Sequence, residues 1–157
     1  MIRALIDQFV DVIRTEDHEE DKAQQRDHAL RMATAVLMID VARADHVFNE
    51  DELNDVLKLI EKHFRLDAED AAQLFNAANE RAEDLTSLHE LTQLLHNNLD
   101  ENEKARVVSL LWRIAYADGE LDKFEDALVL KISDLLHVTR ARVMRLKHDA
   151  ALAAGQT

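Results

Sequence analysis

The sequence contains no cysteine and no proline, only two glycines, and few aromatic residues, at 4% of the chain. Without cysteine there is no disulfide and no thiolate metal site, which fits a reducing compartment, so we expect a cytoplasmic protein. Two glycines leave no room for a glycine-rich phosphate loop. The residues that dominate instead, Ala, Leu, Glu, Asp and Lys, favour helices over sheets. The composition therefore predicts an all-α fold, with residues 1–157 forming a single domain.

Positive charge and long apolar runs are also scarce. The chain has 19 basic against 32 acidic residues, and its net charge of -13 repels phosphate backbones and anionic lipids. The N-terminal stretch MIRALIDQFVDVIR is interrupted by Arg3, Asp7 and Asp11, so it lacks the unbroken apolar stretch of a signal peptide or a membrane span. We therefore expect no nucleic-acid binding and no membrane insertion. Cations, or a protein partner with a basic surface, suit this charge better.

Apolar residues recur at helical spacing along most of the chain. Residues 1–14 are predicted to form an amphipathic helix, followed by an acidic loop to about residue 20. A helix from Lys22 to Ala44 and another over 107–117 are apolar on nearly all sides at their centres, which is typical of helices buried in a bundle. Capping boxes mark four further helix starts: Asn49 with Glu52, Ser87 with Glu90, Asp100 with Glu103, and Asp122 with Glu125. With another start near Asp67, these signals predict a bundle of about eight helices.

One stretch of the sequence occurs twice. ARADHVFNEDEL runs from Ala42 to Leu53, and AYADGELDKFED runs from Ala115 to Asp126. Their alignment, at a constant offset of 73, gives three pairs of polar residues: Asp45 with Asp118 (118−45), Asn49 with Asp122 (122−49) and Glu52 with Glu125 (125−52). Further along, Ile60 pairs with Ile132 at an offset of 72 (132−60), so the second copy is one residue shorter. Each copy reads as a buried helix, an acidic turn, a second helix and the start of a third, which predicts two helix-turn-helix units related by a pseudo-two-fold axis.

The repeat also aligns two charged residues of opposite sign within the buried helices. Asp40 in the first copy corresponds to Arg113 in the second, at the same offset (113−40). A buried charge without a partner is strongly destabilising, so we expect these two residues to form an ion pair across the approximate two-fold. Exposure of either residue to solvent is the alternative.

The double motif resembles that of the tellurite-resistance TerB-like family, and the similarity covers about residues 25–150. Members of that family are all-helical and carry paired motifs of the form A-D-G-x-x-D-x-x-E. The first copy departs from this pattern, because His46 replaces the glycine and Asn49 replaces the second aspartate. The resemblance implies a role in tellurite or other stress responses and metal binding, without an enzymatic reaction.

The acidic turns are the candidate site. In the metal-binding interpretation, six residues converge as hard oxygen ligands for a divalent cation such as Ca²⁺ or Mg²⁺. They are Asp45, Asn49, Glu52, Asp118, Asp122 and Glu125. Neither turn is an EF-hand, since counting from Asp118 puts Lys123 where that loop needs glycine and Val129 where it needs a bidentate glutamate. In the alternative interpretation, the caps only start helices and the acidic face docks a partner, without any cofactor.

No sequence pattern indicates catalysis. The serines lack a nucleophile elbow, and the eight histidines show no Glu-x-x-His pair of the di-iron type. We therefore expect a non-enzymatic stress-response protein whose acidic, cation-binding surface recruits a protein partner. The alternative is a purely structural interaction module that resembles the TerB-like domains attached to co-chaperones and needs no metal. A hydrolase with a carboxylate-held metal is a third hypothesis. The sequence leaves the partner's identity and the oligomeric state open.

Overall fold

The computed structural model describes residues 19–44, 49–83, 88–117 and 121–155, and within these ranges all regular secondary structure is helical. The helices are α2 (Glu19–Ala42), α3 (Glu50–Phe64), α4 (Ala68–Glu83), α5 (Leu88–Asn98), α6 (Glu101–Ala115), α7 (Lys123–Leu135) and α8 (Arg140–Ala153). The all-α prediction is confirmed. The described residues hold seven of the roughly eight helices expected, and the helix predicted over 1–14 lies outside them.

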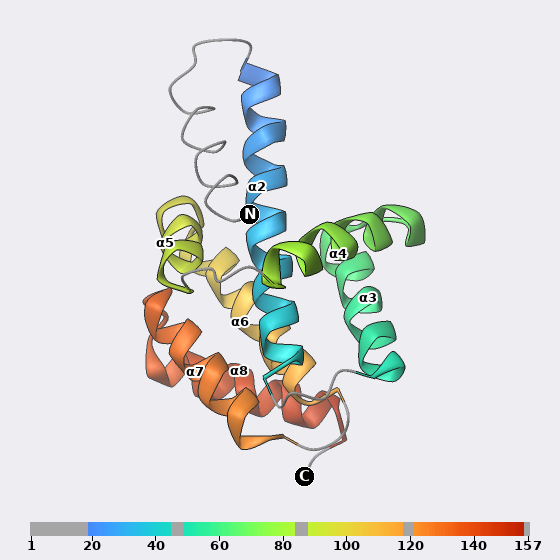
Figure 1. The fold of residues 1–157 in the computed structure, drawn as a ribbon. Helices are drawn as coiled ribbons and strands as arrows, with labels where there is room; N and C mark the ends of the chain where they lie inside the picture. The colour runs from blue at the N-terminus through green and yellow to red at the C-terminus, as the bar shows by residue number, and fades with distance from the viewer. Residues whose placement is uncertain (1–18, 45–48, 84–87, 118–120, 156–157) are drawn as a thin grey trace.

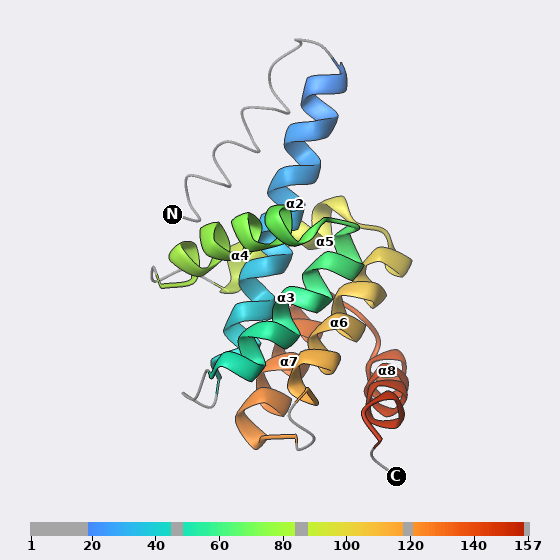
Figure 2. The ribbon, with the colours of Figure 1, turned by 90° about the vertical axis from the view of Figure 1, so that its right-hand side faces the viewer.

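Helices α2 and α6 form the centre of the bundle. They pack against each other, with α3 and α4 on the right, α5 on the left and α7 and α8 below them in Figure 1. Every side chain over 32–39 of α2 is buried, and α6 buries Trp112 and Leu111 completely. Both helices predicted to be buried are therefore core helices. The first turns of α2 project beyond the other described helices (Figures 1 and 2), and residues 23–28 are exposed there.

The two halves of the bundle repeat each other in backbone detail. The central helices end alike, because the N–H of Ala44 donates to the carbonyl of Val41 (3.2 Å) and the N–H of Ala117 donates to that of Ile114 (3.1 Å), 73 residues later. The second helices, α3 and α7, are both followed by a residue in the left-handed conformation. The third helices pack on the first in both halves, α4 on α2 and α8 on α6.

The left-handed residues show the same one-residue difference between the two copies. They are Arg65 (φ 56°) and His137 (φ 61°), at an offset of 72. The next residue closes the same backbone bond in each copy: the N–H of Leu66 donates to the carbonyl of Glu61 (3.0 Å), and the N–H of Val138 donates to that of Ser133 (3.1 Å). These bonds satisfy carbonyls that the helix ends would otherwise leave unpaired. The predicted pseudo-two-fold repeat is confirmed.

Side-chain caps start the helices where the sequence predicted. Asp100 and Glu103 form a reciprocal capping box at α6, with the N–H of Glu103 donating to Asp100 Oδ1 (2.8 Å) and the N–H of Asp100 donating to Glu103 Oε1 (3.0 Å). Asp67 accepts from the N–H of Asp70 (2.8 Å) at the start of α4. Ser87, predicted to cap the helix that is now α5, lies outside the described residues.

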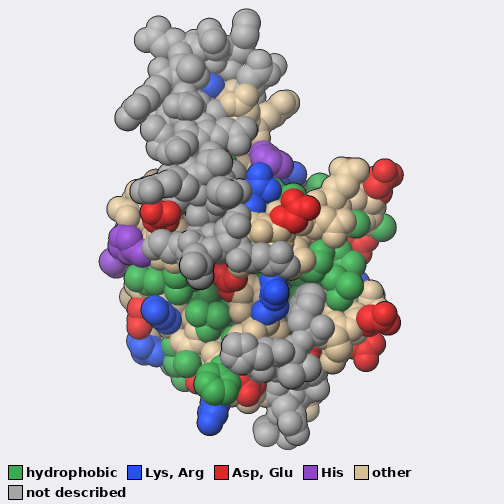
Figure 3. All heavy atoms as spheres, in the orientation of Figure 1, with side chains coloured by type: hydrophobic (Ala, Val, Ile, Leu, Met, Phe, Trp, Pro, Cys, Tyr) green, Lys and Arg blue, Asp and Glu red, His purple; other side chains and the backbone are tan. Residues whose placement is uncertain are grey.

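The surface carries charges of both signs. On the face in Figure 3, acidic, basic and apolar side chains are interspersed, so the net negative charge does not form one continuous patch there. Among the described residues, no helix is both long and apolar enough to cross a membrane.

Candidate cation site between the two acidic turns

The approximate two-fold brings the paired glutamates of the repeat to one small cavity. Glu52 of α3 and Glu125 of α7, which are related by the 73-residue offset, both line this cavity. Its volume is about 10 Å³, near what a single water molecule needs. The remaining lining residues are Ala42, Asp55, Val56, Ile114 and Ala117. The cavity therefore lies where α2, α3, α6 and α7 meet.

The two glutamates differ in burial. Glu125 is only 5% exposed, whereas Glu52 is half-buried. Both lie in the first turn of their helix, where the positive end of the helix dipole stabilises a carboxylate. A buried acidic group beside an ion-sized cavity is a suitable arrangement for holding a cation.

The C-terminal ends of the two central helices also reach the cavity. Ala42, the last residue of α2, and Ala117, just after α6, both line it. A helix C-terminus carries partial negative charge on its unpaired carbonyls, which favours a nearby cation. The N-termini of α3 and α7 thus stabilise the two carboxylates, while the C-termini of α2 and α6 make the potential in the cavity more negative.

Asn49 and Asp122 act as helix caps. The N–H of Glu52 donates to Asn49 Oδ1 (2.9 Å), and the N–H groups of Phe124 and Glu125 donate to Asp122 Oδ2 (2.8 and 3.3 Å). Asn49 and Asp122 are therefore N-caps as predicted, but α3 and α7 show only this half of the predicted capping boxes, whereas α6 shows both halves. Asn49 is exposed and Asp122 is half-buried, and neither residue lines the cavity. Of the six candidate ligands, the structure therefore brings Glu52 and Glu125 together and places Asn49 and Asp122 at the adjacent helix starts.

Asp45 and Asp118 lie outside the described residues. Within the described ranges, no group of three or more His, Asp or Glu side chains is arranged to hold a metal ion. A complete coordination sphere therefore needs ligands in addition to Glu52 and Glu125.

The repeat did not point to Asp55, which joins the two glutamates at the cavity wall. Its counterpart in the second copy is Leu128 (55+73), so a search for paired acidic residues passes over it. The signal that could have found it is its spacing of three from Glu52, which places both on one face of α3.

The expected ion pair between Asp40 and Arg113 is wrong. Arg113 is exposed and lines a groove between α3 and α6, whereas Asp40 is half-buried and the cation that acts on its pKa is Arg43. Burial raises the pKa of Asp40 to about 6, against a smaller opposing effect of Arg43. The two-fold relates these positions but does not bring them together, so solvent exposure, the alternative, holds for Arg113.

The family model described as tellurite resistance protein TerB matches residues 31–148, a span that contains both acidic turns and all of α3 to α7. No curated protein and no solved structure matches the chain.

Proposed function

Since the chain belongs to the tellurite resistance protein TerB family, we propose that it is a binding protein whose two acidic turns together hold one divalent cation. In this proposal, cation binding controls the docking of a protein partner during a stress response. The observation that carries it is the convergence of the symmetry-related Glu52 and Glu125 on one ion-sized cavity.

The chemistry of the cavity favours a hard cation. Its polar side chains, Glu52, Asp55 and Glu125, are all carboxylates, and Ca²⁺ and Mg²⁺ both prefer oxygen ligands. Asp45 and Asp118 supply further carboxylates from the two turns in this proposal, while Asn49 and Asp122 fix the helix starts. Ca²⁺ accepts irregular sets of six to eight oxygens more readily than Mg²⁺, which demands near-octahedral geometry. A site shared by two non-identical turns therefore suits Ca²⁺ better.

In this proposal, a bound ion changes how the partner docks. The cavity joins α2 and α3 of one repeat to α6 and α7 of the other. A cation there ties the two turns together and lowers the negative charge of the surface around them. A partner that docks on this surface then distinguishes the loaded from the empty protein by its charge.

Thermal unfolding by calorimetry tests the cation site. The full chain is unfolded in chelator and then in millimolar Ca²⁺, Mg²⁺, Mn²⁺ or Zn²⁺. A ligand that binds only the folded state at 100 times its Kd adds about 2.7 kcal/mol of stability. For a chain of this size we expect Tm to rise by roughly 5–10 °C with the preferred ion.

Three variants locate the effect. Asp118→Asn and Glu125→Gln are expected to abolish the rise in Tm. Glu103→Gln is the matched control, because it removes the same charge from the same capping position of a helix that starts away from the cavity. If no ion shifts Tm, or if Glu103→Gln removes the shift equally, the cation proposal fails. Helix capping and metal-independent docking of a partner then become the better account.

A further inference from the structure

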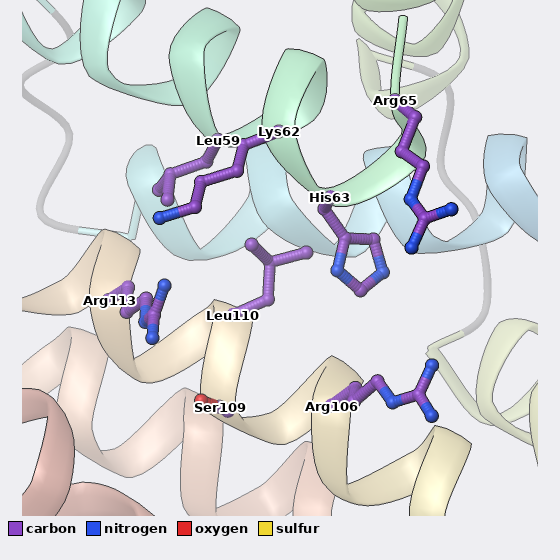
Figure 4. Close-up of a pocket in the computed structure, with 8 residues that line it drawn as sticks. All are labelled: Leu59, Lys62, His63, Arg65, Arg106, Ser109, Leu110 and Arg113. Carbon is purple, nitrogen blue, oxygen red and sulfur yellow. The ribbon is translucent and has the colours of Figure 1, made fainter.

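A groove between α3 and α6 gathers positive charge in this otherwise acidic chain. It has a volume of about 290 Å³ and is lined by Leu59, Lys62, His63, Arg65, Arg106, Ser109, Leu110 and Arg113. No carboxylate is among them. In Figure 4 the side chains of α3 and of Arg65 lie above those of α6. Lys62 and Arg113 lie on one side of Leu110 and His63, and Arg65 and Arg106 lie on the other. Four full positive charges thus line one groove.

These four cations lack acidic partners among the described residues. Lys62, Arg65 and Arg106 take part in none of the ion pairs there, and neither does Arg113. Two of them act on the imidazole of His63, whose pKa is lowered first by burial and then by the charges of Arg106 and Arg113. Like charges that line one groove repel one another, and a bound anion relieves that repulsion. The groove is therefore electrostatically prepared for an anion.

His63 also lines a second hollow, which has a volume of about 250 Å³. Four charged residues line that hollow: Asp27 and Arg31 from α2, and Glu103 and Arg106 from α6. The Glu103 carboxylate already accepts the N–H of Asp100 in the capping box. Arg106 lines both hollows, so Asp27 and Glu103 lie near one of the four cations, whereas Lys62, Arg65 and Arg113 do not line this second hollow.

We infer that this groove binds the phosphate group of a small molecule. Arginine guanidinium groups bind phosphate through paired hydrogen bonds, and Arg106 and Arg113 are two turns apart on the same helix. Ser109 lies between them in sequence and lines the groove, where its hydroxyl can donate to a phosphate oxygen. The volume is suited to a small ligand and too small for a folded partner.

The adjoining surface has room for the rest of an organic phosphate. A hollow of about 520 Å³ shares Leu59, Lys62 and Arg113 with the groove and continues toward the end of α8. Toward α8 its lining is uncharged, formed by Tyr116, Ala117, Ala150, Ala153 and Ala154, while Asp55 and Lys58 of α3 add one charge of each sign. A ligand with its phosphate on the cations therefore places an uncharged portion against the uncharged lining near α8.

The pKa of His63, measured by NMR titration of the full chain, reports whether phosphate occupies the groove. The probes are inorganic phosphate and a nucleoside monophosphate, each compared with chloride at equal ionic strength, and His63→Gln identifies the resonance. A bound dianion stabilises the imidazolium, so we expect a saturable rise in the pKa of His63. Saturation at a lower concentration of the nucleotide identifies an organic phosphate, whereas equal saturation shows that the phosphate group alone is recognised.

Charge-matched variants locate the binding. Arg106→Gln with Arg113→Gln is expected to weaken phosphate binding by more than about tenfold. Lys131→Gln with Arg145→Gln removes the same charge from exposed positions on α7 and α8 and is expected to leave binding unchanged. All four side chains are exposed, so both variants should fold. A His63 pKa that phosphate moves no more than chloride does, or equal binding by the two variants, overturns the inference.

Discussion

Asp40 is an acidic side chain at the end of the most buried stretch of α2. The eight residues before it are buried, and Asp40 itself is half-buried. Burial raises its pKa to about 6, because the charged form loses hydration that Arg43 only partly replaces. Arg43 is in turn engaged with Asn79, to whose Oδ1 it donates (3.3 Å). Asp40 therefore costs the folded state stability whenever it is ionised.

The pH dependence of this cost has a definite sign. An unfolded aspartate titrates near pH 3.9, so below about pH 4 Asp40 is protonated in both states and carries no penalty. As pH rises from about 4 to about 6, the unfolded chain ionises first and stability falls. Asp40→Asn should therefore be more stable than the parent by about 1–3 kcal/mol at pH 7.5, with little difference at pH 3.5.

Urea unfolding at the two pH values measures this difference. Asp149→Asn, at an exposed position of α8, is the control and should change stability by less than about 0.5 kcal/mol at either pH. Destabilisation of Asp40→Asn at pH 7.5 would instead mean that the ionised carboxylate makes a favourable interaction in the fold.

At the scale of single elements, the helix ends determine how the repeat is built. N-terminal caps were predictable because they depend on residues three apart, as at Asp100 and Glu103. The left-handed C-terminal residues were not, because Arg65 and His137 lack the glycine that normally signals this conformation. Their positions follow from the backbone bonds that end α3 and α7, which the tertiary packing stabilises.

Arg65 offers a direct test of the strain at such a helix end. A non-glycine residue in the left-handed region costs about 1 kcal/mol, so Arg65→Gly should raise the free energy of unfolding by roughly 0.5–1 kcal/mol. Arg65→Ala removes the same charge and keeps the strain, so chemical denaturation should show no comparable gain. Equal stabilisation by both substitutions would assign the effect to relief of charge repulsion in the α3 and α6 groove.

At the scale of the whole molecule, the pseudo-two-fold explains which sequence predictions hold. The repeat predicted the paired helices, and the structure brings Glu52 and Glu125 to one cavity. The same reasoning failed for Asp40 and Arg113, because a symmetry relation alone does not say which side chains face the axis.

The basic groove could not be read from the sequence. Its cations come from the end of α3 and from α6, between 41 (106−65) and 51 (113−62) residues apart, and only the folded packing brings them to one groove. The spacing of Lys62 and Arg65 at the end of α3, and of Arg106 and Arg113 in α6, is a visible signal of one-sided charge. The sequence does not show how α3 and α6 are aligned against each other. The acidic turns were recognisable because the motif recurs, whereas the groove draws on non-equivalent parts of the two repeats.

The most direct test of the account is the stoichiometry of cation binding, because a shared site predicts one ion for two turns. Isothermal titration calorimetry of the full chain, with the ion that raises Tm most, should give one ion per chain. Glu52→Gln and Glu125→Gln should each weaken that single event, since both carboxylates line the same cavity. Two independent ions per chain, or a single ion whose affinity depends on only one of the two glutamates, would contradict a site shared between the turns.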